Sequence, residues 1–420
     1  MKRLWFAPLW FLAAPAWAAD LALVGGDVYP VSGAMIPGGT VLIRGEVIEK
    51  VGKNVPLPAG IKTLDVRGKR VTPGLFDADS QIGLIEIDLE KSGVDAVAQT
   101  PDPIRAALSA ADAIDLRSSL VGVARRQGVT TVLSLPGGGL VAGQGALLDL
   151  VEERSPLLRT AIHPKVALVV QLGGEGAQAV EQTRAAAVLR FRELLDDARA
   201  YQRNKAAFLK AQLYPLSASR LDLEALSEAL AGRQTVILKV SRAADIELAL
   251  SLAQQEKLKV VLLGAEEGWK VADRIAAAKV PVILDGLLNV PASLEARGAR
   301  SDNAALLARA GVKVAISARS SHNTGTLRFH LGNAVRAGLP AELALRAATQ
   351  VPAEIFGQGQ KYGTLDPKKV ANVVVWSGDP FEPASYAEQV IIRGEVQPTD
   401  SRQTKLARRH LGRLSLMRSK

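Results

Sequence analysis

Four histidines and no cysteine limit the chemistry that this 420-residue chain can perform. The histidines are His163, His322, His330 and His410. Without cysteine there is no disulfide, no thiolate-bound zinc and no thiol nucleophile. His163 precedes a proline and is expected in a turn or at a strand edge, and His330 is expected to pack within a helix. So few histidines argue against a histidine-rich metal centre.

His322 is the histidine best placed for catalysis. It lies beside Ser320, Ser321 and Asn323, in a segment that follows an apolar, strand-like run. A serine hydroxyl activated by a histidine can perform nucleophilic catalysis. The sequence, however, contains no G-x-S-x-G nucleophile elbow and no S-x-x-K pair. We therefore do not expect serine-type catalysis.

The composition is that of a folded protein whose positive charge lies at its ends. Hydrophobic residues make up 48% and charged residues 22% of the chain, and the net charge is +10. Lys2 and Arg3 carry two of these charges, and the segment from Arg402 to Lys420 carries seven more with no acidic residue. The remaining chain is close to neutral. A basic face for nucleic acid is therefore not expected.

The first 19 residues have the pattern of a secretory signal. A short basic start precedes the apolar run Leu4–Leu12, and Ala16 and Ala18 form an A-x-A end. The apolar run is too short to span a bilayer, and no later run approaches about 18 residues. We predict cleavage near Asp20, export across the inner membrane and a periplasmic location. The alternatives are a buried N-terminal strand and an uncleaved anchor.

The basic C-terminal segment, residues 399–420, allows two interpretations. Leu406, His410, Leu414 and Met417 recur at helical spacing and would form one apolar stripe. Such a helix could contact anionic lipid headgroups or an acidic partner surface. The alternative is a solvated terminus.

Strand and helix patterns alternate through the central part of the chain. Helical patterns separate the later apolar runs, one of them around Ile246 and Leu250. This alternation predicts parallel strands joined by right-handed crossovers. The stretch from 71 to 357 suits an eight-stranded (β/α)8 barrel. A doubly wound open sheet is the alternative, but no G-x-G-x-x-G follows a strand. The apolar runs are Thr131–Leu135, Val166–Leu172, Thr235–Val240, Lys259–Gly264, Val280–Leu284 and Val312–Ser317.

Both ends of the mature chain contain short β patterns broken by glycine and proline. Neither part is long enough to form a good core alone, so we expect them to pair in one small β-sandwich with the barrel inserted between them. The expected division is a signal over 1–19, a first sandwich part over 20–70, a barrel over 71–357, a second sandwich part over 358–398 and a basic tail over 399–420.

Several short motifs, taken in order, resemble the amidohydrolase superfamily. Val71–Ala78 resembles the start of its first barrel strand, and Tyr362–Pro380 resembles the return into its β-domain. Arg242–Ile246, Leu327–Phe329 with Ala334–Leu339, and Gly143–Ala146 are similar to the exported, imidazolonepropionase-related branch. The resemblance spans about Leu21 to Gln397. It implies a barrel whose mouth binds one or two divalent metals that activate water to hydrolyse C–N bonds.

The resemblance also implies where the metal ligands would lie, and this chain differs at each alignable position. Asp79-Ser80-Gln81 stands in place of the first His-x-His pair. Lys239 and Gly264 stand near the histidines of the fifth and sixth strands, and Arg319 stands near the aspartate of the eighth. A cation repels a metal dication strongly where the dielectric constant is low. We therefore predict no metal; zinc or another divalent metal is expected only if the chain is an active hydrolase.

These substitutions suggest a site filled by the protein's own charges. We hypothesise that Lys239 and Arg319 occupy the former metal space and pair with Asp79, with Gln81 filling the remaining hydrogen bonds. The alternative is that both cations point into solvent at loop ends. Candidate ligand-pocket residues are Gln144, His322 and Asn323.

Three functional classes follow from this hypothesis. The first is an exported pseudoenzyme or non-catalytic subunit, as a homo-oligomer or joined to an active paralogue. The second is an active hydrolase of amide, cyclic amide or peptide C–N bonds with an atypical site. The third is a binding module that holds a small anion between Asp79, Lys239 and Arg319.

Overall fold

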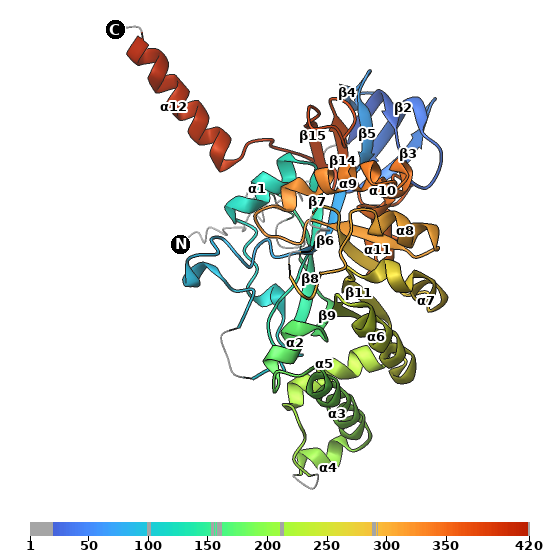
Figure 1. Ribbon diagram of the computed structural model, residues 1–420. Helices are drawn as coiled ribbons and strands as arrows, with labels where there is room; N and C mark the ends of the chain where they lie inside the picture. The colour runs from blue at the N-terminus through green and yellow to red at the C-terminus, as the bar shows by residue number, and fades with distance from the viewer. Residues whose placement is uncertain are drawn as a thin grey trace, which may run out of the picture.

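Two eight-stranded sheets organise the chain, as Figure 1 shows. The computed structural model describes residues 20–98, 102–152, 155, 157, 162–210, 214–287, 291 and 293–418. The expected signal, residues 1–19, lies outside the described residues. Within the described ranges, no helix has both the length and the apolar character needed to cross a membrane.

One sheet curls into a nearly closed barrel, which confirms the predicted barrel fold. Its strands follow one another in sequence order, and Ser317 of the last strand contacts Asp77 of the first. All six predicted strand runs lie in this sheet. The strands are β6 (Leu75–Ser80), β7 (Val129–Ser134), β8 (Val141–Asp149), β9 (Ile162–Gln171), β10 (Thr235–Val240), β11 (Val260–Gly264), β12 (Val282–Asp285) and β13 (Val314–Ser317).

One barrel strand departs from the all-parallel pattern. β8 runs antiparallel to both β7 and β9, whereas the other neighbouring pairs are parallel. Only six residues separate Ser134 from Val141, which is too few for a crossover helix but enough for a hairpin. As a result, Asp149 at the end of β8 lies beside Thr131, near the start of β7. This end of the barrel is opposite the mouth.

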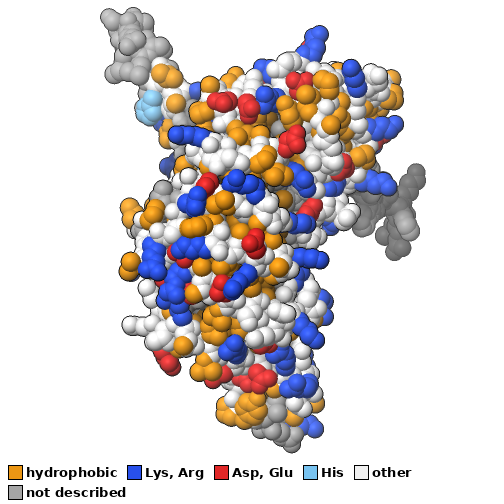
Figure 2. Space-filling model, turned by 45° about the vertical axis from the view of Figure 1, so that its right-hand side comes forward, with side chains coloured by type: hydrophobic (Ala, Val, Ile, Leu, Met, Phe, Trp, Pro, Cys, Tyr) orange, Lys and Arg blue, Asp and Glu red, His pale blue; other side chains and the backbone are white. Residues whose placement is uncertain are grey.

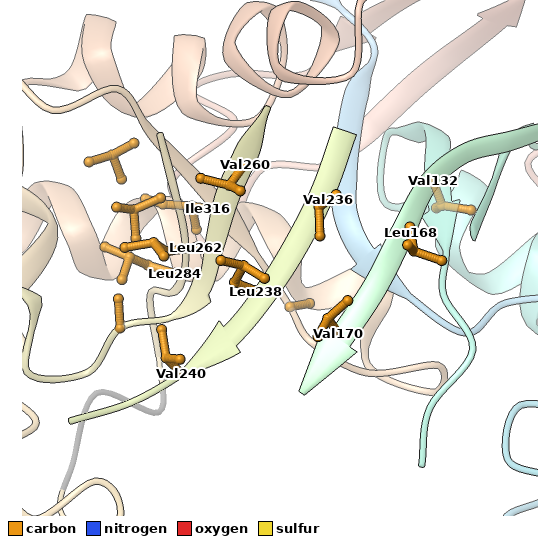
Figure 3. Close-up of a cluster of buried hydrophobic side chains, with 14 of the residues drawn as sticks. Val132, Leu168, Val170, Val236, Leu238, Val240, Val260, Leu262, Leu284 and Ile316 are labelled. Carbon is orange, nitrogen blue, oxygen red and sulfur yellow. The ribbon is translucent and has the colours of Figure 1, made fainter. Parts of the chain in front are cut away.

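Alternate residues of the strands face two different cores. Phe76, Leu133, Val169, Ile237 and Val261 fill the barrel interior. Their neighbours along the strands face the surrounding helices, and Figure 3 shows Leu168 and Val170 of β9 beside Val236, Leu238 and Val240 of β10. Burial on both faces explains why these strands are almost continuously apolar in sequence.

The helices cover the outside of the barrel (Figure 1). Ser118 and Thr183 cap two of them through side-chain oxygens that accept backbone N–H bonds. Short 3-10 turns lie at Lys91–Gly93, Ala110–Asp112, Gly268–Val271 and Thr324–Thr326. The helices are α1 (Ser119–Arg126), α2 (Gly174–Ala179), α3 (Arg184–Arg203), α4 (Lys205–Leu209), α5 (Arg220–Leu230), α6 (Ala243–Glu256), α7 (Ala272–Ala277), α8 (Asn303–Arg309), α9 (Leu327–Arg336), α10 (Ala341–Ala347) and α11 (Gln350–Ile355).

The second sheet joins both ends of the chain, as predicted. β5 from the N-terminal part pairs antiparallel with β14 from the C-terminal part. The segment expected to be the first barrel strand is divided: β5 belongs to this sheet, and the barrel begins at Leu75. The strands are β1 (Leu21–Val28), β2 (Ile36–Arg44), β3 (Val47–Gly52), β4 (Lys62–Asp65), β5 (Arg70–Pro73), β14 (Val373–Trp376), β15 (Ala387–Ile392) and β16 (Glu395–Gln397).

Gly74 allows the chain to pass from one sheet to the other. A Cβ atom at this position would lie 2.1 Å from the Thr130 hydroxyl oxygen, which is closer than any real contact. The connection between the two sheets therefore requires glycine here.

The basic C-terminal segment forms helix α12 (Arg402–Arg418), which extends away from the body in Figure 1. On the face shown in Figure 2, Lys and Arg side chains are mixed with acidic and hydrophobic ones. This mixture agrees with the near-neutral charge of the body.

Candidate functional site at the barrel mouth

The carboxyl ends of the parallel strands form the mouth of the barrel, where functional sites of such barrels lie. A cavity of about 220 Å³ opens there. Its lining comes from the ends of the parallel strands β9 and β10 and from loops that follow the barrel strands. The charged and amide side chains in the lining are Gln171, Glu175, Lys239, Glu266, Glu295 and Arg319.

Arg319 lies between two carboxylates at this mouth. Its Nη1 donates to Glu266 Oε1 at 2.8 Å, and its Nε lies 3.5 Å from Asp79 Oδ2. The side chains of Arg319 and Asp79 are 22% and 18% exposed, so the pair is largely shielded from water. The hypothesised pairing of Arg319 with Asp79 is therefore present in the structure, with Glu266 as a further partner.

Burial and charge act in opposite directions on these groups. Burial opposes ionisation of Arg319, but Asp79 and Glu266 outweigh it and raise the pKa of the guanidinium. Burial also raises the pKa of Asp79, and Arg319 and Lys239 only partly offset this effect. Arg319 also has a left-handed backbone, with φ of 49°, which is uncommon for a residue with a side chain.

Lys239 has a different partner from the one expected. Its Nζ donates to both carboxylate oxygens of Glu175, at 2.8 and 2.9 Å. Gln81 also differs from the hypothesis, because its Nε2 lies 3.5 Å from the carbonyl oxygen of Leu135. The expected network of Asp79 with both cations and Gln81 is thus divided into two separate ion pairs.

Gly264 supplies backbone freedom where a histidine would lie in the resemblance. Its φ is +100°, and a Cβ there would lie 2.9 Å from the carbonyl oxygen of Val240 and 3.1 Å from Glu266 Oε2. The turn at this glycine brings Glu266 next to Arg319. A side chain at position 264 would therefore disturb both the strand end and the ion pair.

Asp77 lies beneath the mouth and is fully buried. Its Oδ1 is hydrogen-bonded to the Ser317 hydroxyl, and its Oδ2 has no partner. Burial raises the pKa of Asp77 to about 8. The carboxyl is therefore protonated at neutral pH, and Ser317 links the first and last barrel strands through it.

His330 on α9 lies beside the carboxyl end of β12, at the mouth. Its Nδ1 lies 3.0 Å from Asp285 Oδ1 at the end of β12, and its Nε2 lies 3.2 Å from the Thr326 hydroxyl. The expectation that His330 packs within a helix agrees with its burial in α9. Sequence patterns do not indicate this polar contact, because Asp285 and His330 are far apart along the chain.

The three candidate ligand-pocket residues do not line this cavity. Gln144 on β8 donates to the carbonyl oxygen of Ala106 and accepts from Gln234, which precedes β10 and so lies toward the opposite end of the barrel. His322 is exposed and lies 3.3 Å from Asp88, and Asn323 is also exposed. Gln144 lies within the antiparallel strand β8, so it is not at the carboxyl end of a parallel strand.

The cavity instead contains polar residues that sequence reasoning missed: Gln171, Glu175, Glu266 and Glu295. Two of them could have been found. Gln171 lies near the end of the apolar run Val166–Leu172, and Glu266 follows the run Lys259–Gly264. A polar residue at the carboxyl end of a barrel strand is a candidate for the mouth. Nothing in the sequence indicates that Glu295 folds back against Gly173 and Gly174.

The donor set at the mouth does not suit a divalent metal. In the part of the chain that the structure describes, no group of three or more His, Asp or Glu side chains is placed to hold a metal ion. Asp79 and Glu266, two carboxylates at the mouth, are both engaged by Arg319. A dication would have to displace a guanidinium from this shielded place.

Comparisons with known proteins define the class. The profile of the amidohydrolase family matches residues 88–398. The chain is 26% identical to a solved amidohydrolase from Thermotoga maritima, with a TM-score of 0.81 over 90% of this chain and 99% of the other. Molinate hydrolase shares the fold, at 16% identity and a TM-score of 0.60 over 91% and 95% of the two chains. The protein belongs to the amidohydrolase family.

A curated relative extends well beyond the matched region. The amidohydrolase tasK of Hapsidospora irregularis is 24% identical over an alignment of 393 residues that covers 86% of this chain. The chain spans about 40% of the length of that relative.

Proposed function

We propose that this protein is an amidohydrolase-family member that has lost metal-dependent hydrolysis. The observation that carries the proposal is the position of Arg319, whose guanidinium contacts both Asp79 and Glu266 at the mouth. A cation of the protein thus neutralises the carboxylates that would otherwise attract a metal.

The repulsion between a metal dication and Arg319 would be large. Two unit charges 4 Å apart interact by about 4 kcal/mol at an effective dielectric constant of 20, so a dication and a guanidinium would repel by about 8 kcal/mol. Arg319 does not become neutral easily, because Asp79 and Glu266 raise the pKa of its guanidinium. The water-activating step of metal-dependent hydrolysis therefore has no support at this mouth.

The cellular role is part of the same proposal. We place the mature chain in the periplasm, as a member of the exported, imidazolonepropionase-related branch. It would act as a non-catalytic subunit, either with copies of itself or with an active paralogue. The lone basic helix α12 favours contact with an anionic surface, either a lipid or an acidic partner.

Two relatives are named as amidohydrolases, which favours the alternative, an active hydrolase of C–N bonds with an atypical site. Metal content separates the two. The mature protein is purified without chelator from cells grown with zinc and manganese, and its metals are measured by mass spectrometry. We expect far less than one metal ion per chain. A stoichiometric metal that is lost together with the Asp79→Ala change would overturn the proposal.

A matched variant keeps a negative result informative. The combined changes Asp79→His, Gln81→His, Lys239→His, Gly264→His and Arg319→Asp restore the ligand types that the family resemblance implies. If this variant folds and gains metal, the natural substitutions account for the loss. The single change Lys239→His serves as the control and should bind no metal, because Arg319 remains.

A further inference from the structure

Among the described residues, three side chains around the mouth cavity have buried polar atoms without a hydrogen-bond partner. They are both amide atoms of Gln171, Oε2 of Glu266 and Oε2 of Glu295. All three residues line the same cavity of about 220 Å³. Buried polar atoms in folded proteins nearly always have hydrogen-bond partners, so a cluster of exceptions around one cavity indicates a site for a ligand.

Gln171 is the strongest indication of a ligand. Its side chain is only 2% exposed, at the end of β9, yet neither its oxygen nor its nitrogen has a hydrogen-bond partner in the part of the chain that the structure describes. Leaving such an amide unsatisfied costs about 1–3 kcal/mol. A molecule in the cavity that accepts from Nε2 and donates to Oε1 would remove this cost.

The free atoms define the chemistry of that molecule. Three of the four are acceptors, and two of these belong to carboxylates whose other oxygens are held by Arg319 and Arg184. The cations are already engaged, because Lys239 donates to Glu175 and Arg319 donates to Glu266. Among the described residues, the cavity therefore offers unpartnered buried acceptor atoms for a donor-rich cation, and its cations already bind carboxylates.

We infer that this cavity binds a small compound that carries a primary ammonium group beside a carbonyl group, and that it does so without hydrolysing it. The ammonium group would donate to Glu266 Oε2 and Glu295 Oε2, and the carbonyl oxygen would accept from Gln171 Nε2. This inference rests on the proposed loss of hydrolysis, since it concerns the same mouth. It replaces the anionic ligand of the third functional class above. Lys239 is paired with Glu175, and Arg319 is paired with Asp79 and Glu266.

Glycinamide is the probe, because it combines an ammonium group with a primary amide. Binding is measured by calorimetry on the full mature chain. Acetamide lacks the ammonium group, methylammonium lacks the carbonyl group, and acetate tests the anionic alternative. We expect glycinamide to bind at least about tenfold more tightly than acetamide or methylammonium, since a hydrogen bond to a charged group contributes about 1.5–3 kcal/mol and 1.4 kcal/mol is tenfold. Acetate should not bind.

Two variants test the geometry. Gln171→Leu removes the amide at similar size, and Glu266→Gln removes the charge. Each should weaken glycinamide binding about tenfold. Glu193→Gln makes the same chemical change on the exposed part of α3 and should leave binding unaltered. If Glu266→Gln fails to fold, Gln171→Leu still decides the matter.

The outcomes separate the inference from the proposed function. If glycinamide does not bind, or if acetate binds in its place, the cavity holds only water or an anion and the inference is wrong. If glycinamide binds and ammonia is released faster than from the Glu266→Gln variant, the binding inference stands and the proposed loss of hydrolysis is wrong. Binding with the compound recovered intact supports both.

Discussion

The two ends of the barrel both bury an arginine beside carboxylates, yet their polar atoms are satisfied to different degrees. At the end of the barrel opposite the mouth, called the closed end below, Arg393 lies against Asp149, which is fully buried. At the mouth, Arg319 lies against Asp79 and Glu266. The same type of charge pairing thus occurs in two places in one barrel.

At the closed end, both carboxylate oxygens of Asp149 have protein partners. Oδ1 accepts from Asn372 at 2.9 Å and from Thr131 at 3.3 Å. Oδ2 accepts from Tyr362 at 2.8 Å and from Arg393 at 3.2 Å. These partners come from the barrel, from the second sheet and from the segment between the two, so the network stabilises the contact between the two sheets.

At the mouth, by contrast, Gln171, Glu266 and Glu295 keep unpartnered buried atoms around a cavity. A network that is fully satisfied within the protein is built for stability, whereas one that leaves atoms free is available to another molecule. The comparison therefore distinguishes a structural joint from a binding site without reference to catalysis.

The largest effect is expected at the joint. Asp149→Ala leaves the guanidinium of Arg393 and the polar groups of Tyr362 and Asn372 without their shared partner. Because removal of one member of a buried ion pair is strongly destabilising, we expect a loss of about 3–5 kcal/mol in the free energy of unfolding. Urea denaturation followed by circular dichroism measures it. Asp65→Ala, which removes an exposed ion pair with Arg67, is the control and should leave the midpoint unchanged.

Asp77, beneath the mouth, predicts that the stability of the protein depends on pH. Burial raises its folded pKa to about 8, whereas the unfolded chain has the ordinary value of 3.8. The folded state therefore holds a proton that the unfolded state releases between these values, and stability falls as the pH rises from about 4 to 8. The slope is up to about 1.4 kcal/mol for each pH unit.

Asp77→Asn isolates this contribution, because asparagine resembles the neutral acid. The difference in unfolding free energy between the natural protein and the variant should change steadily in favour of the variant from pH 5 to pH 8. His163, whose pKa is lowered mainly by burial, contributes equally to both proteins and cancels. A difference that is independent of pH would show that Asp77 is ionised in the folded protein.

One pair of substitutions should change stability in opposite directions at the two ends. Tyr362→Phe removes a donor that Asp149 uses, so we expect a loss of about 1–2 kcal/mol. Gln171→Leu removes an amide that has no partner, so without ligand we expect a gain of about 1 kcal/mol. Thermal unfolding of both variants in the same buffer tests the contrast. Equal losses for the two would mean that Gln171 is satisfied in the folded protein.

The smallest effect is expected for Lys239, although the family resemblance implies a metal ligand at its position. Its ion pair with Glu175 is partly open to solvent, with the two side chains 32% and 60% exposed. Lys239→Gln should therefore change the unfolding free energy by less than about 1 kcal/mol. A loss as large as that of Asp149→Ala would place Lys239 in the buried network with Asp79, as first hypothesised.

The apolar runs of the sequence determined most of the fold. Runs such as Thr235–Val240 and Val312–Ser317 are buried on both faces, so their composition alone indicates strands covered by helices. β8 escaped this reasoning. Its glycines at 143 and 145 are typical of a loop, and only pairing with β7 and β9 makes the segment a strand.

The charged residues show the limit of the same reasoning. The sequence by itself determined that cations stand at positions 239 and 319 and an aspartate at position 79, where the family resemblance implies metal ligands. Only the tertiary structure decided that Arg319 contacts Asp79 and Glu266 and that Lys239 binds Glu175. It also decided that the buried amide of Gln171 has no hydrogen-bond partner among the described residues. Ion pairs form between residues that the folded backbone brings within a few ångströms, and hydrophobic periodicity carries no information about those distances.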